Sequence, residues 1–130
     1  SKRLKLLFLL SIPLFIIHGL DEYFNEFYNI DDWILVVSRV LNISPQVFFV
    51  LLQVSWWFIL LYSGFVFKNK NGKFLIIVLT GLIMLSEAQH LFFSVSTKTY
   101  SPGIFTALLL FPLFSFFYWK ELLKNWERAK

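Results

Sequence analysis

A chain of 130 residues with 58% hydrophobic and only 15% charged residues is not a soluble domain, because soluble domains carry about 25% charged residues and so short a chain cannot bury that much apolar surface. The composition therefore predicts an integral membrane protein. The chain has no cysteine, which excludes disulfides, thiol nucleophiles and cysteine-ligated metal sites. Its net charge is +4. In a membrane protein, basic residues collect on the cytoplasmic side, so we take this charge as a sign of topology and expect no nucleic-acid partner.

The first apolar stretch runs from about residue 6 to residue 23 and follows the basic residues Lys2, Arg3 and Lys5. About 20 apolar residues are enough to cross the hydrocarbon of a bilayer, so this stretch predicts a transmembrane helix. A cleaved signal peptide would end in small residues of an Ala-x-Ala pattern, but the first alanine is Ala88. We therefore expect the stretch to stay in the protein as span one.

Residues 31–42 predict a short helix between the first two spans. Asp31 and Asp32 suit a helix start, but the stretch is too short to cross the membrane and carries Arg39 in its middle. A helix that lies in the membrane interface, with Trp33 at headgroup depth, fits this pattern.

Three further apolar stretches are long enough to span the membrane, at about residues 45–67, 74–96 and 102–119. The basic tail, residues 120–130, is expected to continue as an amphipathic helix that contacts anionic lipid. The predicted fold is therefore all-α, a four-span transmembrane helical bundle with a short interfacial helix between spans one and two. The whole chain, residues 1–130, is predicted to be a single integral membrane domain.

The positions of lysine and arginine predict the orientation. With the N-terminus inside, ten of the 12 basic residues lie on the inside, and only Arg39 and Lys98 lie outside. Lys and Arg collect on the cytoplasmic side of membrane proteins, so we expect both termini in the cytoplasm. Residues 68–73 are then expected to form a tight cytoplasmic turn between spans two and three.

Two spans carry ionisable residues, which are costly in hydrocarbon and usually functional. Span one carries His18, Asp21 and Glu22, and span three carries Glu87 and His90. Residues three or four apart share one face of a helix, so each set is expected to form a cluster on its own helix.

The two clusters are predicted to lie at the same depth. At about 1.5 Å per residue, His18 lies roughly 18 Å and Glu87 roughly 20 Å from the inner edge of the membrane. Gln53 in span two falls in the same layer, and Thr106 lies just inside span four. We therefore expect one site in the outer leaflet, with Gln53 and Thr106 as supporting residues that contact a bound cofactor or its ligands, and with five metal-ligating candidates: His18, Asp21, Glu22, Glu87 and His90.

Two imidazoles and two or three carboxylates are a ligand set that suits a divalent transition metal. Glu87-x-x-His90 also has the spacing that di-iron carboxylate bundles use. We expect zinc first and iron second. The site would serve a membrane enzyme that acts on an apolar or lipid-like substrate, with His18, Glu22 and Glu87 as catalytic residues.

Other interpretations of the same residues stay open. The cluster could hold a metal, a lipid or a small ligand without turnover, or its charges could only specify helix packing without any cofactor. The partners expected from the sequence are membrane lipid and an apolar or lipid-like ligand, and an oligomer or a partner subunit also stays open.

Two stretches of the chain resemble a known family. Residues 18–22 read His-Gly-Leu-Asp-Glu and resemble the signature of the HXXEE-domain membrane proteins, a bacterial family without an assigned function; Asp21 stands where the signature has Glu. Residues 87–90 and 100–107 resemble the later Glu/His segment of that family and the entry to its last span. The resemblance implies a multi-pass protein of the bacterial plasma membrane with a His/carboxylate site, and it implies no particular reaction.

A second resemblance, by analogy of the site alone, is to sterol-isomerase-type membrane proteins of the emopamil-binding class. These set a histidine and carboxylates on adjacent spans to move a proton in an apolar cavity. His18 and Glu22 on one helix, with Glu87 opposite, would suit that general acid–base chemistry. The connectivity and the number of spans differ from that class, so the likeness says nothing about the fold.

Overall fold

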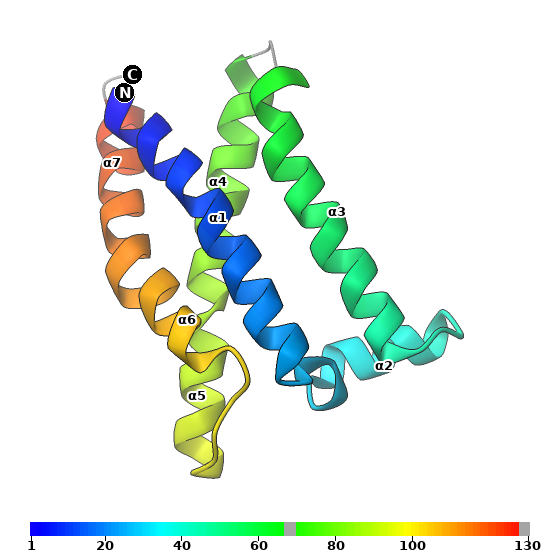
Figure 1. The fold of residues 1–130 in the computed structure, drawn as a ribbon. Helices are drawn as coiled ribbons and strands as arrows, with labels where there is room; N and C mark the ends of the chain where they lie inside the picture. Colours follow the sequence, from blue (N-terminus) through cyan, green and yellow to red (C-terminus); the bar gives the residue numbers. More distant parts are fainter. Residues whose placement is uncertain (67–69, 128–130) are drawn as a thin grey trace.

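The computed structural model describes residues 1–66 and 70–127, and every regular element in this part of the chain is helical (Figure 1). Four helical stretches are long and apolar enough to cross a membrane. The predicted four-span, all-α bundle with a short helix between the first two spans is therefore confirmed. The protein is a membrane protein.

Span one is a single helix, α1 (Lys2–Phe24), which continues through Pro13. The chain leaves it at Asn25, whose side-chain amide donates hydrogen bonds to the backbone oxygen and the carboxylate of Asp21. Glu26 then takes a left-handed conformation, with φ of 57°. This turn leads into the short 3₁₀ segment η1 (Phe27–Asn29).

The predicted short helix is α2 (Asp32–Val40), which lies at an angle to the spans (Figure 1). Asp31 begins it, because its carboxylate accepts a hydrogen bond of 2.9 Å from the backbone N–H of Ile34. α2 packs on span two, which is α3 (Pro45–Val66) and begins with a proline. Proline suits a first helical turn because the N–H it lacks would have no partner there.

Span three is divided into α4 (Lys70–Ser86) and α5 (Ala88–Thr97), with Glu87 between them. The backbone N–H of His90 bonds the carbonyl of Glu87, three residues back instead of four, so the chain tightens at this point. Of the predicted turn at residues 68–73, residues 68 and 69 lie outside the described part, and residues 70–73 belong to the first turn of α4.

Span four consists of α6 (Ile104–Leu108), the π-helical segment η2 (Leu109–Phe114) and α7 (Ser115–Glu127). The backbone leaves the helical region at Phe111, where ψ is −143°. Phe111 precedes Pro112, and a proline disfavours the α conformation of the residue before it. Helix α7 extends past residue 119, so the predicted helical continuation into the basic tail is confirmed up to Glu127.

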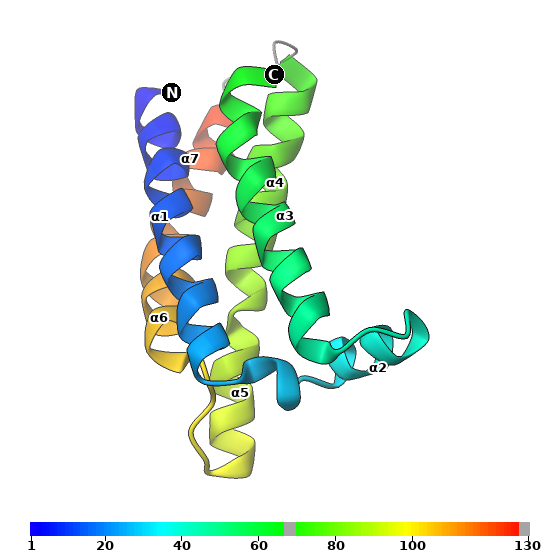
Figure 2. The same cartoon turned by 45° about the vertical axis from the view of Figure 1, so that its right-hand side comes forward.

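Helix α1 packs against α3 on one side and against α6 and α7 on the other, while α4 packs on α7 (Figures 1 and 2). The main core lies between α1, α3, α4 and span four, and it consists of Leu4, Phe8, Ile12, Phe15, Leu60, Ile76, Met84, Leu110, Tyr118 and Leu122. Large apolar side chains also cover the outside of the bundle; Phe58, Phe92 and Phe105 are each at least two-thirds exposed. An exposed apolar surface of this extent fits a lipid environment.

Candidate metal centre

Four polar side chains meet inside the bundle. His18 and Glu22 come from α1, Glu87 lies at the junction of α4 and α5, and His90 follows in the first turn of α5. All four are buried, with exposed fractions between 0 and 6%. One ligand atom from each of them lies within 4.8 Å of the others. We call these four residues the cluster.

The distances within the cluster are close to those between the ligands of a single metal ion. Four ligands at 2.0–2.1 Å from an ion lie about 3.3 Å apart when they form a tetrahedron. The observed separations are 2.6 Å from His18 Nε2 to Glu87 Oε2, 3.1 Å from His90 Nε2 to Glu22 Oε1, 3.3 Å from His90 Nε2 to Glu87 Oε2, and 3.6 Å from His18 Nε2 to Glu22 Oε1.

Three of these four atoms are fully buried and have no partner of good hydrogen-bond geometry among the described residues: His18 Nε2, His90 Nε2 and Glu87 Oε2. Their near neighbours are the other ligand atoms of the cluster, at ion-pair distance. Buried polar atoms are almost always satisfied in folded proteins, because an unpaired one costs about 1–3 kcal/mol. Four ligand atoms gathered this closely, three of them without a hydrogen bond of good geometry among the described residues, are placed as metal ligands are.

The other nitrogen of His18 is fixed by Thr106. His18 Nδ1 lies 2.6 Å from Thr106 Oγ1, and that hydroxyl can donate its one hydrogen to Asp21 Oδ2 at 2.9 Å or to the Gly103 carbonyl at 3.0 Å. With either acceptor, the threonine oxygen is left to accept the Nδ1–H of His18. His18 Nε2 then presents its lone pair to the centre of the cluster, as a metal-ligating imidazole does.

Similar contacts orient His90 and Glu22. His90 Nδ1 lies 3.2 Å from Ser101 Oγ. Gln53 of α3 donates a hydrogen bond of 2.9 Å to Glu22 Oε2, which leaves Glu22 Oε1 facing the cluster. Gly19 allows this contact between helices, because a Cβ at that position would lie 2.7 Å from the side-chain oxygen of Gln53.

Gly103 closes the cluster from the start of span four. Its φ is +83°, a conformation that side chains rarely adopt, so glycine suits the backbone here. A Cβ on Gly103 would also lie 2.9 Å from Glu22 Cγ and 3.0 Å from His18 Cε1. Phe27 of η1 covers another side, with its ring centre 4.8 Å from that of His90.

The structure brings together four of the five predicted metal ligands and leaves Asp21 outside the cluster. Asp21 precedes Glu22 by about 100° around α1, so the two carboxylates point in different directions and Asp21 contacts Thr106 instead. Asp21 also affects Tyr100, which lies outside the spans. Desolvation by burial, and after it the negative charge of Asp21, raise the pKa of the Tyr100 phenol, so this phenol stays neutral.

Both predicted supporting residues, Gln53 and Thr106, make direct contact with cluster residues. Three other residues of the site were not predicted from the sequence: Phe27, Ser101 and Gly103. The Pro-Gly pair at residues 102 and 103 is a turn signal, but nothing in the sequence shows that this turn lies against the two histidines.

One family of known proteins matches most of the chain. Residues 9–118 match the family described as a protein of unknown function with an HXXEE motif, and the matched segment contains all four cluster residues. No curated protein and no solved structure matches the chain. The match covers most of the chain, and the chain belongs to the HXXEE family.

Proposed function

We propose that this protein binds one divalent transition-metal ion inside the membrane, at His18, Glu22, Glu87 and His90. One observation carries the proposal: four buried potential ligand atoms converge, and three of them lack a hydrogen-bond partner. Charge supports it too, because two neutral imidazoles and two carboxylates balance an ion of charge +2. A centre without net charge suits a low-dielectric environment.

The ligand set favours zinc, with iron(II) second. Calcium and magnesium take oxygen ligands in larger numbers and have little use for imidazole, whereas zinc and iron(II) accept two histidines together with carboxylates. Four protein ligands at separations near those of a tetrahedron are typical of zinc in particular.

We further propose that the ion serves an enzyme whose substrate is lipid-like and carries an oxygen atom. A bound ion that takes a fifth ligand would act as a Lewis acid for that oxygen, and the ligands His18, Glu22 and Glu87 would be the catalytic residues that contact the ion. Since all three side chains are buried, a substrate would reach them from the membrane and not from water.

Two tryptophans of helix α3 would suit a substrate of this kind. The indole N–H groups of Trp56 and Trp57 are buried, and no described residue accepts a hydrogen bond from them. Both tryptophans lie within about one helical turn of Gln53, which contacts Glu22. Apolar rings with free donors beside the cluster suit an amphiphile that brings its own hydrogen-bond acceptor.

The competing interpretation is a metal-free network that only holds helices together. The 2.6 Å separation of His18 Nε2 and Glu87 Oε2 is also what a charged pair would show. In that case two protonated histidines would balance the two carboxylates, and the cluster would have a purely structural role.

Elemental analysis of detergent-purified protein separates the two interpretations. The metal-binding proposal predicts about one zinc or iron per chain in the wild type, and its loss in His90→Ala and His18→Ala. Gln89→Ala is the matched control, because Gln89 is an exposed polar neighbour of His90 in α5, and it should keep the metal. Wild-type protein that contains no stoichiometric metal and takes none up on soaking would overturn the proposal.

The membrane and the orientation are part of the same proposal. We place the protein in the bacterial plasma membrane with both termini in the cytoplasm. With this orientation, ten basic residues lie on the cytoplasmic side and two on the outer side, as is typical of membrane proteins. Helices α1 and α4 begin and α7 ends at the same end of the bundle (Figure 1). The first turns of α1 and α4 and the second half of α7 carry Lys2, Arg3, Lys5, Lys70, Lys73, Lys120 and Lys124.

A further inference from the structure

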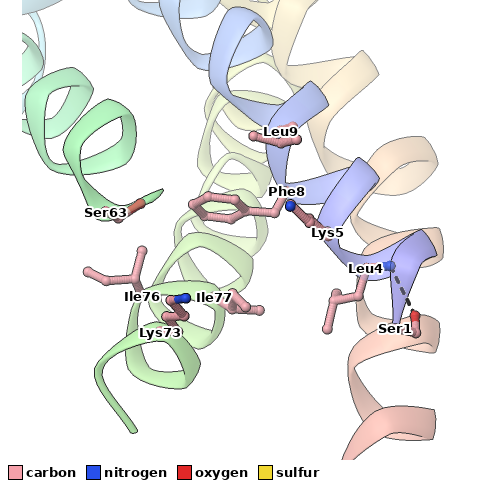
Figure 3. Close-up of a pocket in the computed structure, with 9 residues that line it drawn as sticks. All are labelled: Ser1, Leu4, Lys5, Phe8, Leu9, Ser63, Lys73, Ile76 and Ile77. Atoms are coloured by element: carbon pink, nitrogen blue, oxygen red, sulfur yellow. Dashed lines mark hydrogen bonds between the residues drawn. The ribbon is translucent and has the colours of Figure 1, made fainter. Parts of the chain in front are cut away.

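A cleft of about 320 Å³ opens at the end of the bundle where α1 begins, far along α1 from the cluster (Figure 3). It lies between α1, α3 and α4. Its walls are mostly apolar and include Leu4 and Phe8 of α1 and Ile76 and Ile77 of α4, and Ser63 of α3 lies at one side.

Two lysines line the same cleft from different helices. Lys5 belongs to the first turns of α1, and Lys73 belongs to the first turns of α4. Both side chains are exposed, and within residues 1–66 and 70–127 neither ammonium group has an ion-pair partner. Among the described residues, none that lines the cleft is acidic. It therefore combines apolar walls with two positive charges that are not compensated.

This combination matches the chemistry of an anionic phospholipid. The apolar walls belong to helices that cross the membrane, so hydrocarbon fills such a cleft more favourably than water does. The lysines lie near the ends of two spans, where long basic side chains reach the headgroup layer. A soluble phosphate would use the lysines but leave the apolar walls without a partner.

We propose that this cleft binds one anionic glycerophospholipid from the adjoining leaflet. Its phosphate lies between Lys5 and Lys73, and part of one acyl chain lies against Phe8 and Ile76. The site is independent of the metal centre. Since α1 and α4 both line it, the bound lipid joins α1, which carries His18 and Glu22, to the helix that leads to Glu87.

A second basic cleft, between α1 and α7, provides the control. Arg3, Lys120 and Lys124 line it at the same end of the bundle, so its net charge matches that of the first cleft, but Glu121 lies among them, and a carboxylate repels a phosphate. Removing the two lysines of that cleft changes the net charge of the protein by the same amount as removing Lys5 and Lys73.

Native mass spectrometry of protein purified with equal amounts of phosphatidylglycerol and phosphatidylcholine, of identical acyl chains, tests the proposal. We expect one retained phosphatidylglycerol per chain in the wild type. A lysine near an anionic membrane surface is worth about a factor of five in affinity, so Lys5→Gln with Lys73→Gln should lower retention about 25-fold. Lys120→Gln with Lys124→Gln should leave it unchanged.

A charge-neutral variant tests the apolar half of the site. Ser63→Phe places a ring into the cleft, and we expect it to displace the lipid while circular dichroism shows the fold retained. Equal loss in both double-lysine variants would overturn the proposal, because it would show attraction by net charge alone. Retention of the lipid in folded Ser63→Phe, or its displacement by soluble glycerol phosphate, would overturn it as well.

Discussion

At the scale of single residues, the candidate site depends on contacts outside the four cluster side chains. Thr106 orients His18, Gln53 orients Glu22, and Gly103 provides a turn that leaves no room for a Cβ. Such contacts orient the side chains of His18 and Glu22 before any ion binds. A bound ion would offset the cost of leaving three buried atoms without hydrogen-bond partners among the described residues.

The replacement Thr106→Val tests the orientation of His18. Valine keeps the shape of threonine but cannot accept the Nδ1–H of His18, and loss of such a partner weakens metal affinity about 10- to 100-fold. Titration of metal-free protein with zinc measures the change. Thr80→Val is the control, because Thr80 is buried in α4, where its hydroxyl donates to the carbonyl of Ile76, and it is not part of the cluster. Equal affinity of Thr106→Val and wild type would contradict the role assigned to Thr106.

The sequence predicted the cluster well because helix periodicity and depth follow directly from residue numbers. His18 and Glu22 are four apart, Glu87 and His90 are three apart, and the two pairs lie at equal depth. The position of Asp21 could not be settled in this way, since it shares a helical face with His18 but points away from Glu22. Its contact with Thr106 depends on where span four packs, and no local pattern encodes that.

At the scale of elements, two of the four spans are not continuous α-helices. The interruption of span four comes from Pro112 and could be expected from the sequence. The interruption of span three at Glu87 has neither proline nor glycine beside it, so the sequence gives no local sign of it. It is a consequence of packing, and it places Glu87 where its side chain reaches both histidines.

Two side chains of α7 donate hydrogen bonds to backbone carbonyls of α4. Tyr118 is fully buried, and its hydroxyl donates a hydrogen bond of 2.8 Å to the carbonyl of Ile77. Trp119 donates one of 3.0 Å to the carbonyl of Gly81. These bonds join the second half of span four to the helix that leads to Glu87.

The replacement Tyr118→Phe tests this connection. It removes one hydrogen bond and keeps the ring, so we expect the free energy of unfolding in detergent to fall by about 0.5–1.5 kcal/mol. Metal content should not change, because Tyr118 does not contact the cluster. Tyr62→Phe is the control, since Tyr62 is exposed on α3. A loss of metal with unchanged stability would show that this account of α7 is wrong.

At the scale of the whole molecule, charge is separated along the bundle. Most basic residues lie at the end where α1 begins, and the ionisable cluster lies further along α1, toward the opposite end. This asymmetry supports the proposed orientation, which would expose the cluster end to the extracytoplasmic side.

Single-cysteine labelling tests the orientation directly, and the native chain contributes no background because it has no cysteine. We expect an impermeant maleimide added outside intact cells to label Asn29→Cys and Lys98→Cys. It should label Asn71→Cys, near the start of α4, only after the cells are opened. Labelling of Asn71→Cys in intact cells would reverse the topology.

The central claim is that His18, Glu22, Glu87 and His90 hold one metal ion. X-ray absorption spectroscopy at the zinc edge of zinc-loaded protein measures this most directly. The account predicts four nitrogen and oxygen ligands at about 2.0–2.1 Å, with the outer-shell scattering of two imidazoles in the wild type and of one in His90→Ala. Six oxygen ligands without imidazole scattering would contradict it, because they would place the ion on surface carboxylates and outside the cluster.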